Sequence, residues 1–166
     1  MKYAIVYSSR TGNTKLLAET IRAALPAEDC IYCGAPDSAA LAAERIYAGF
    51  WTDKGACDEQ TAAFLKTLTD QELFLFGTAG FGESQDYFDK VLERTRQHLS
   101  DGVRLAGSFM CQGKMPMAVR ERYEKLLNSP AKIPNIQGMI ENFDKALRHP
   151  DQQDLEQLKI SVQKSL

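Results

Sequence analysis

Residues 3–14 constrain the fold of this chain more than any other segment. Residues 3–7 are five consecutive apolar or aromatic side chains, without alternation of polar and apolar positions. Such a run is typical of a strand that is buried on both faces, as in a parallel sheet. A polar loop at 8–14 follows, and apolar side chains then recur at helical spacing. These are Leu16, Leu17, Ala18, Ile21, Ala24 and Leu25. We therefore predict a strand, a short polar loop and a helix.

The polar loop indicates an anion-binding site. It consists of Ser8, Ser9, Arg10, Thr11, Gly12, Asn13 and Thr14. Backbone N–H groups of such a loop converge with the positive end of the helix dipole, and together they favour an anion. The four hydroxyl side chains add donors, and Gly12 lets the backbone approach a ligand closely. Arg10 is a candidate for additional positive charge.

The composition of this loop narrows the kind of anion. A dinucleotide-binding loop carries three glycines in the pattern G-x-G-x-x-G, whereas this loop has one. A Walker loop needs G-x-x-x-x-G-K-[ST], and the nearest string here, ending Gly113-Lys114-Met115, has the wrong spacing and no final hydroxyl. A loop rich in hydroxyls and poor in glycine suits a terminal phosphate monoester.

Here the residues match a known pattern. The run Ile5-Val6-Tyr7-x-Ser9-x-x-Gly12-x-Thr14-x-x-x-Ala18-x-x-Ile21 resembles the flavodoxin signature at every defined position. The resemblance implies that the loop holds the 5′-phosphate of FMN. It also implies an α/β fold with a doubly wound, five-stranded parallel sheet in the order 2-1-3-4-5.

The rest of the chain has the element order that such a fold requires. Further strands are predicted at 29–33, 45–50, 72–77 and 103–111, with helical patterns between them. Alternation of strands and helices predicts a parallel sheet with helices on both faces. Additional helices are expected at 117–127, 138–147 and 151–165. We expect one domain over residues 1–166, with a core at about 1–127 and a C-terminal helical extension at about 137–166.

Two further loops should meet the phosphate loop, because the carboxyl ends of parallel strands lie at one edge of a sheet. The loop after the third strand begins with the sole tryptophan, and the loop after the fourth strand places an aromatic between two glycines. Large aromatics can stack on a flat ring and shield it from water. The predicted cofactor residues in these loops are Trp51, Thr52, Asp53, Lys54, Gly55, Thr78, Ala79, Gly80, Phe81 and Gly82.

The family resemblance extends to these loops, with departures. The loop after the third strand resembles the flavodoxin loop that carries a tryptophan over the flavin, and the loop after the fourth resembles the second flavin loop. Phe81 stands where the family often has Tyr or Trp, and Lys54 stands where many flavodoxins have acidic residues. We expect Lys54 to make the lower one-electron potential less negative.

Composition and charge exclude other classes. The net charge of −2 lacks the basic footprint of a nucleic-acid-binding protein, and no apolar run approaches the ~18 residues of a membrane span. We expect neither nucleic acid nor membrane as a partner, and a cytoplasmic location. The last helices either cover the sheet or form a dimer face, so that a monomer or a weak dimer is expected.

The cysteines predict no metal or redox centre. Cys30 and Cys33 have C-x-x-C spacing, but they fall in a predicted strand, where residues i and i+3 point to opposite faces. No second Cys/His pair at zinc spacing is present in the sequence, and Cys57 and Cys111 stand apart. We interpret all four as inert thiols. Nothing in the sequence resembles a nucleophile–base pair, so no catalytic residue is assigned.

Two functions fit these patterns. One is an FMN-binding, low-potential electron carrier, with a reductase as donor and a flavoenzyme as acceptor. The alternative is a stand-alone FMN-dependent NAD(P)H oxidoreductase that acts on a quinone or another organic acceptor. Trp51 favours the carrier because it covers a flavin face, whereas Gln112-Gly113-Lys114 could line a substrate pocket. Strings 49–55 and 110–116 also resemble the flavodoxin-like proteins associated with bilirubin reduction in anaerobes, which implies a flavoenzyme partner.

Overall fold

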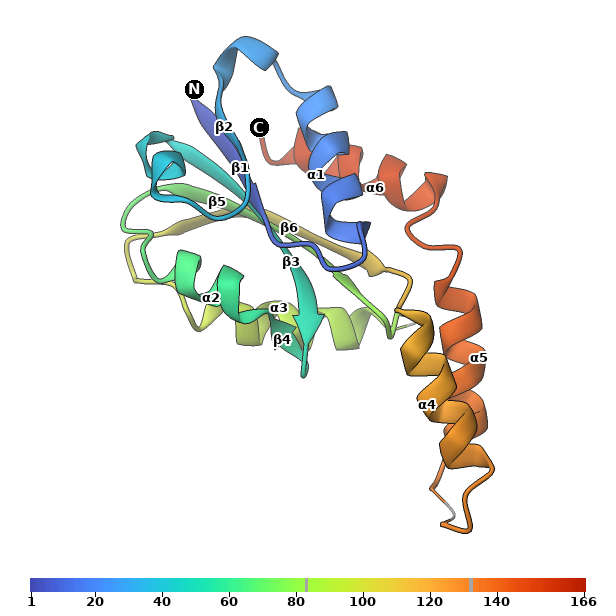
Figure 1. Cartoon of the computed structure of the whole chain (residues 1–166). Helices are drawn as coiled ribbons and strands as arrows, with labels where there is room; N and C mark the ends of the chain where they lie inside the picture. The colour runs from blue at the N-terminus through green and yellow to red at the C-terminus, as the bar shows by residue number, and fades with distance from the viewer. Residues whose placement is uncertain (83, 132) are drawn as a thin grey trace.

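A twisted sheet with parallel central strands forms the middle layer of the protein (Figure 1). The computed structural model describes residues 1–82, 84–131 and 133–166. The strand order is β2-β1-β3-β5-β6, and a two-residue strand, β4, pairs with β3 alone. The strands are β1 (Tyr3–Tyr7), β2 (Cys30–Gly34), β3 (Arg45–Asp53), β4 (Ala56–Cys57), β5 (Glu72–Ala79) and β6 (Arg104–Gln112). Apart from the extra β4, this is the predicted order, and the predicted fold class is confirmed.

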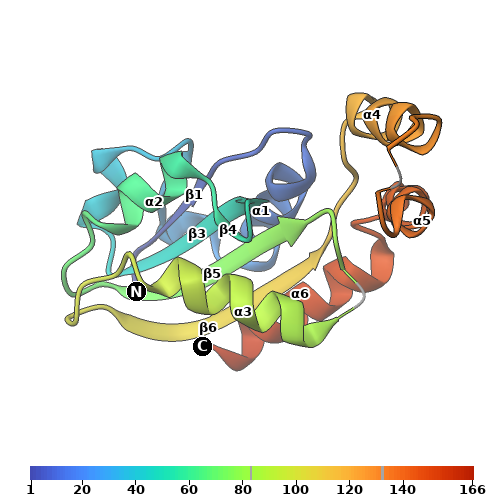
Figure 2. The same cartoon turned by 90° about the horizontal axis from the view of Figure 1, so that it is seen from below.

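Helices cover both faces of the sheet (Figure 2). On one face lie α1 (Asn13–Ala24) and α6 (Gln152–Lys164), and on the other lie α2 (Glu59–Leu65) and α3 (Gln85–Arg96). Two buried clusters fill the spaces between the layers. Phe50 and Leu75 belong to the cluster under α2 and α3, whereas Ile5, Phe74 and Leu158 belong to the cluster under α1 and α6. The uninterrupted apolar runs of the central strands follow from this two-sided burial.

The segment between β2 and β3 is helical but does not form an α-helix. Residues Ser38–Ala42 form a 3₁₀ helix, and a short one at Ala27–Asp29 precedes β2. Asp37 caps the second, because its carboxylate accepts a hydrogen bond from the Ala39 N–H at 2.8 Å. The chain is already extended at Ala43, so the segment is too short for α-helical nucleation.

The third strand is longer than predicted. We expected a loop from Trp51 onward, but β3 continues to Asp53 and turns into β4. Lys54 and Gly55 form the two-residue turn, with φ values of 53° and 81°. Left-handed conformations at both positions are typical of a tight hairpin turn, and pairing with β4 extends the strand beyond its last partner on β5.

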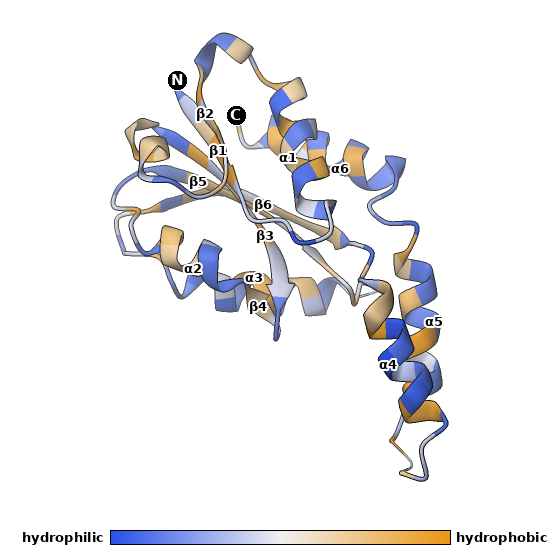
Figure 3. Ribbon diagram, viewed as in Figure 1, coloured by the Kyte–Doolittle hydropathy of each residue, from blue (hydrophilic) through white to orange (hydrophobic). Residues whose placement is uncertain are grey.

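A helical hairpin leaves the α/β body beside the carboxyl ends of the strands (Figures 1 and 2). It consists of α4 (Met117–Leu127) and α5 (Ile136–Ala146), and hydrophobic and strongly hydrophilic residues are mixed along both (Figure 3). Tyr123, Ile140 and Phe143 form its small apolar core. The last helix, α6, instead covers the sheet, with Leu158 and Val162 fully buried. Of the two roles left open for the C-terminal helices, α6 therefore has the covering one.

An ion-pair network joins three strands at the sheet edge opposite the carboxyl ends of β1, β3 and β5. Glu72 on β5 accepts hydrogen bonds from Arg45 on β3 at 2.7 Å and from Arg104 on β6 at 2.8 Å. The Arg45 side chain is almost fully buried, at 7% exposure. The hydrogen bond from Arg45 holds the pKa of the Glu72 carboxyl below its usual value.

We predict that Glu72→Gln lowers the free energy of unfolding at pH 7 by about 2 kcal/mol, because it leaves the buried Arg45 guanidinium without its anion. Since the carboxyl pKa is lowered on folding, this contribution is present at neutral pH and is lost as the pH falls through that lowered value. Urea unfolding of both proteins at pH 7 and at about pH 2 checks this. An equal deficit at both pH values would contradict it.

Candidate cofactor site

The candidate site lies where the carboxyl ends of β1, β3, β5 and β6 meet, at the sheet edge predicted for a ligand. A pocket of about 130 Å³ opens there. Its walls come from the loop after β1, the end of β3, the end of β5 and the segment after β6. The lining residues are Arg10, Thr11, Asn13, Trp51, Thr52, Thr78, Ala79, Gly80, Gly113, Lys114, Met115, Pro116 and Val119.

The predicted phosphate loop leads directly into α1. Gly12 is the N-cap of this helix and has a φ of 89°, a left-handed conformation that L side chains rarely adopt. No atom lies within 4 Å of the position that a Cβ would take there, so the space in front of the loop is open. The first N–H groups of a helix have no intrahelical partner. Together with the dipole of this 12-residue helix, they suit a phosphate.

Buried hydroxyls hold this loop against the neighbouring strand ends. Thr14 Oγ1 donates to the Phe50 carbonyl at 3.1 Å and lies 3.3 Å from Thr78 Oγ1. Thr52 Oγ1 in turn donates to the Thr78 carbonyl at 2.8 Å. Ser8 is also buried, and its hydroxyl donates to the Gln60 side chain. These side chains therefore fix the relative positions of three strand ends.

Trp51 presents its indole ring to the pocket from β3. The Arg10 guanidinium lies over this ring, 5.4 Å from its centroid, which is a cation–π arrangement. Ligand pockets are usually at least about 300 Å³ in volume, and this one is smaller, with the Arg10 side chain over Trp51 as part of its wall. Arg10 is exposed and lies in a loop, so rotation of its side chain frees the ring face.

The loop after β5 contributes part of the opposite wall. Thr78, Ala79 and Gly80 line the pocket. A Cβ at Gly80 would lie 2.4 Å from the Met115 sulfur, so any larger residue here would displace the Met115 side chain. Phe81 and Gly82 are not among the lining residues. Phe81 is 42% exposed, and its ring meets Tyr87 edge-on at 6.4 Å.

Three predicted residues lie at the hairpin that follows Thr52. Asp53 ends β3, and Lys54 and Gly55 form the turn. Arg94 on α3 donates to the Gly55 carbonyl at 3.2 Å and ties the turn to the body of the protein. Ser9 lies at the other side of the pocket, where its hydroxyl accepts the Lys15 N–H at 3.3 Å. None of these four residues lines the pocket itself.

The segment after β6 is a fourth wall that our site prediction left out. The Lys114 carbonyl accepts hydrogen bonds from Asn13 Nδ2 at 2.9 Å and from Thr11 Oγ1 at 3.3 Å. The Gly113 N–H donates to the Ala79 carbonyl at 2.9 Å. The position of Gly113-Lys114 directly after the fifth predicted strand is the sequence signal that indicates this wall. From the sequence, we assign these residues only to the substrate pocket of the alternative enzyme.

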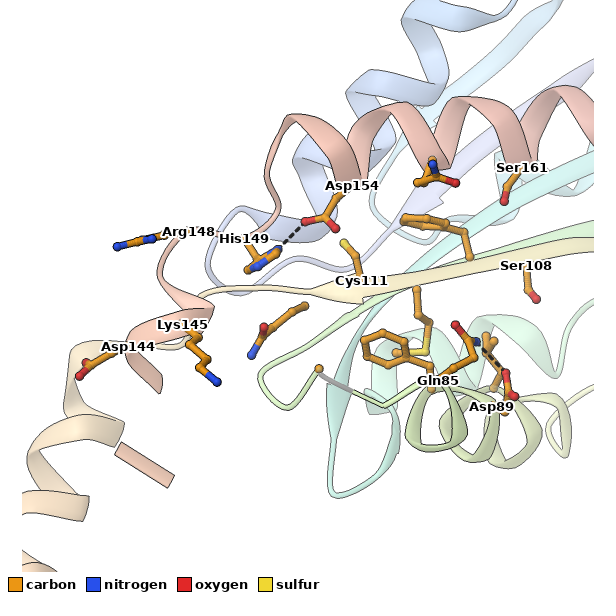
Figure 4. Close-up of a pocket in the computed structure, with 17 residues that line it drawn as sticks. Gln85, Asp89, Ser108, Cys111, Asp144, Lys145, Arg148, His149, Asp154 and Ser161 are labelled. Carbon is orange, nitrogen blue, oxygen red and sulfur yellow. Dashed lines mark hydrogen bonds and ion pairs between the residues drawn. The ribbon is translucent and has the colours of Figure 1, made fainter. Parts of the chain in front are cut away.

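A larger cleft of about 840 Å³ runs along β6, between α3 and α6 (Figure 4). Two of its acidic side chains already have partners: Asp154 Oδ2 lies 2.6 Å from His149 Nδ1, and Asp89 accepts a hydrogen bond from Gln85 (Figure 4). Asp154 and Asp151 also cap each other's backbone at the start of α6. These hydrogen bonds account for the close approach of the His149, Asp151 and Asp154 side chains.

The cysteines are free thiols in protected positions. Cys57 and Cys111 are buried, and Cys30 and Cys33 are half-buried in β2. Burial raises the pKa of Cys57 to about 11 and also raises the pKa of Cys33 and of Cys111. Raised pKa values disfavour the reactive thiolate form. The structure thus agrees with the interpretation of these residues as inert.

Comparison with known proteins identifies the class. The family model described as "Flavodoxin domain" matches residues 4–163, and the chain therefore belongs to the flavodoxin family. It is 44% identical over 172 residues to the flavodoxin-like domain-containing protein BilS of Clostridium symbiosum, covering 93% of this chain and 90% of that one. The BilS protein of Clostridioides difficile is 29% identical over 163 residues, with the same coverage.

A solved structure agrees on the fold. The short-chain flavodoxin associated with a non-canonical bacterial microcompartment superposes with a TM-score of 0.54 at 15% identity. The match covers 88% of this chain and 96% of that chain. Within the described parts of the present chain, we find no helix that combines the length and apolar character needed to span a bilayer.

FMN is the cofactor of this family fold, and the residues at the site fit it. The open space before Gly12 and the N–H groups of Asn13 and Thr14 at the start of α1 suit a phosphate. Trp51 offers a flat apolar surface to one face of a ring system. Gly80 and Gly113 also line the pocket, where the absence of a side chain leaves room for a planar group.

We predict that Asn13→Ala raises the dissociation constant of FMN about tenfold. The substitution removes the hydrogen bond from Asn13 to the Lys114 carbonyl, which holds the phosphate loop in place. Thr20→Ala, which removes a hydroxyl bonded within α1 to Leu16, is the matched control. Titration of the apo-protein with FMN, followed by quenching of flavin fluorescence, measures both. Equal affinities in the two variants would show that the Asn13 bond does not support the site.

Proposed function

We propose that this protein is a low-potential electron carrier, which receives electrons from a reductase and passes them to a partner redox enzyme. FMN supplies the electron-transfer chemistry when it is bound. The observation that carries the proposal is the narrow pocket, enclosed from four sides by protein. Such a slot holds a flat ring by its faces and leaves little room for an organic substrate to stack upon it.

The residues of the chain have separate roles in this proposal. Backbone N–H groups at Gly12 and Asn13 bind the phosphate, and Trp51 excludes water from one ring face. Gly80 and Gly113 pack against the Met115 and Asn13 side chains on the other side. Exclusion of water by Trp51 disfavours an additional negative charge on a bound group and lowers its reduction potential, whereas the cations Arg10 and Lys114 in the pocket wall act in the opposite direction.

The stand-alone NAD(P)H oxidoreductase remains the second candidate, because Gly113 and Lys114 line the pocket. The contacts of these residues favour the carrier. A Cβ on Gly113 would lie 2.4 Å from Asn13 Nδ2, and the Lys114 carbonyl is bonded to the phosphate loop. The segment therefore closes the site, whereas a nicotinamide needs an open ring face.

The acceptor that we propose is a flavoenzyme. This rests on the strings 49–55 and 110–116, which resemble those of proteins associated with bilirubin reduction, and on the similarity to proteins named BilS. The residues of both strings lie at or beside the pocket, since Trp51, Lys114 and Met115 line it. The strings therefore coincide with the surface from which electrons would leave.

Stepwise anaerobic photoreduction of the FMN-loaded protein tests the carrier against the enzyme. We expect reduction in two resolved one-electron steps in the visible spectrum, and no oxidation of NADPH or NADH by the protein alone. A single two-electron bleaching, together with NAD(P)H oxidation in the absence of any partner, would favour the stand-alone oxidoreductase instead.

Lys54 is predicted to raise the lower of the two one-electron potentials. We expect Lys54→Gln to make that potential more negative by about 20–40 mV, the equivalent of about 0.5–1 kcal/mol for a charge at an exposed site. Spectroelectrochemical titration measures it. Lys66→Gln, in an exposed lysine at the end of α2, is the control, and an unchanged potential in Lys54→Gln would refute the role.

A further inference from the structure

We propose that the rim of the cofactor pocket is a basic docking surface and that the physiological partner presents an acidic electron-transfer face to it. This inference rests on the proposed carrier function and specifies the chemistry of the partner. It concerns four residues, Arg10, Lys15, Lys54 and Lys114, which we call the basic rim.

Two members of the basic rim line the pocket itself. Arg10 comes from the loop after β1 and Lys114 from the segment after β6, and the side chains of both residues are exposed. None of the described residues that line this pocket is an aspartate or a glutamate. The charge at the mouth of the pocket is therefore positive on two of its four walls.

The other two members belong to chain segments that adjoin the pocket wall, since each lies two residues beyond a lining residue, Asn13 or Thr52. Lys15 is exposed in the first turn of α1, next to the phosphate loop, and its N–H is bonded to the Ser9 hydroxyl. Lys54 is exposed at the tip of the β3–β4 hairpin, three residues beyond Trp51. The turn holds Lys54 in a left-handed conformation, and the bond from Arg94 to Gly55 fixes the turn in place.

The basic rim is also unpaired. None of its four cations forms an ion pair with another residue that the structure describes, whereas Arg45 and Arg104 share Glu72, and Arg120 pairs with Asp144. Cations that the protein leaves without internal anions remain available to a partner's carboxylates. Such charges act mainly by steering association and by selecting partners.

An exposed apolar side chain adjoins the pocket. Met117 is 56% exposed and follows Pro116, which lines the pocket. A flexible methionine is common at protein interfaces, where apolar contacts are combined with charged ones. We therefore include Met117 in the docking surface.

The local charge is opposite in sign to the charge of the whole chain, which is −2. The FMN phosphate makes the loaded protein more negative still, but four rim cations outnumber one phosphate group of about two charges. The salt dependence of the reaction rate shows whether the positive rim or the negative net charge of the protein governs association. At moderate ionic strength, charges within about 10 Å of the reacting group dominate.

Oxidation of the photoreduced, FMN-loaded protein by small ions of opposite charge tests the basic rim without knowledge of the partner. Hexacyanoferrate(III) is the anionic probe and tris(phenanthroline)cobalt(III) the cationic one. Each metal ion accepts one electron, so two of them oxidise one fully reduced flavin. Stopped-flow absorbance at several salt concentrations gives the rate constants. We expect the rate with the anion to fall about tenfold with added salt and the rate with the cation to rise.

Matched variants assign the effect to the rim. Lys54→Gln and Lys114→Gln together should remove most of the salt dependence with the anion, whereas Lys66→Gln should leave it unchanged. Lys66 is an exposed lysine directly after α2. It precedes the start of β5, which lies at the edge of the sheet opposite the cofactor pocket. Rates that rise with salt for the anion and fall for the cation would overturn the basic rim.

The proposed function is tested separately in the same apparatus. An acidic b5-type cytochrome is offered to the reduced protein in place of the inorganic ions. Its rapid reduction, slowed by salt, supports both the carrier function and the basic rim. If the inorganic probes show a basic rim but photoreduction bleaches the flavin in a single two-electron step and the protein alone oxidises NAD(P)H, the carrier function is contradicted while the charge of the surface stands.

Discussion

Burial of the sheet on both faces is the constraint on which the rest of this structure depends. Because helices cover β1, β3 and β5 from both sides, these strands are uniformly apolar and their polar residues are confined to the ends. Parallel strands bring their carboxyl ends to one edge. The phosphate loop, Trp51 and Gly80 meet there although they are far apart in the sequence, and buried threonines then join these strand ends to one another.

The segment after β6 ties this edge together. Through its carbonyl, Lys114 bonds to two side chains of the phosphate loop, and the neighbouring Gly113 bonds to the loop after β5. The same segment leads into α4, so the helical hairpin begins inside the cofactor site. The ligand edge of this flavodoxin fold is thus hydrogen-bonded to the segment from which the helical hairpin projects (Figure 1).

The sheet order could be predicted from the sequence because it follows from local patterns of strands and helices, and the polar loop at 8–14 leads into α1 as expected. The apolar run at 3–7 and the signature through Ile21 leave few alternatives. The ends of β3 and the fourth wall were harder to predict. Whether Trp51 lies in a loop or a strand depends on pairing with β4, and the role of Lys114 depends on a contact about a hundred residues away. Neither interaction leaves a periodic signal in the sequence.

The two ends of the helical hairpin meet at one point of the α/β body. The chain leaves the α/β body at Lys114 and returns at His149, where the Lys114 N–H donates to the His149 carbonyl at 3.0 Å. Near the body, the hairpin is held by Asn142 on α5, which donates to the Gly80 carbonyl at 3.0 Å, and by Val119 on α4, which lines the pocket. The far tip, where α4 turns toward α5, makes neither contact. Changes in length or sequence at this tip would therefore leave the geometry of the cofactor edge intact.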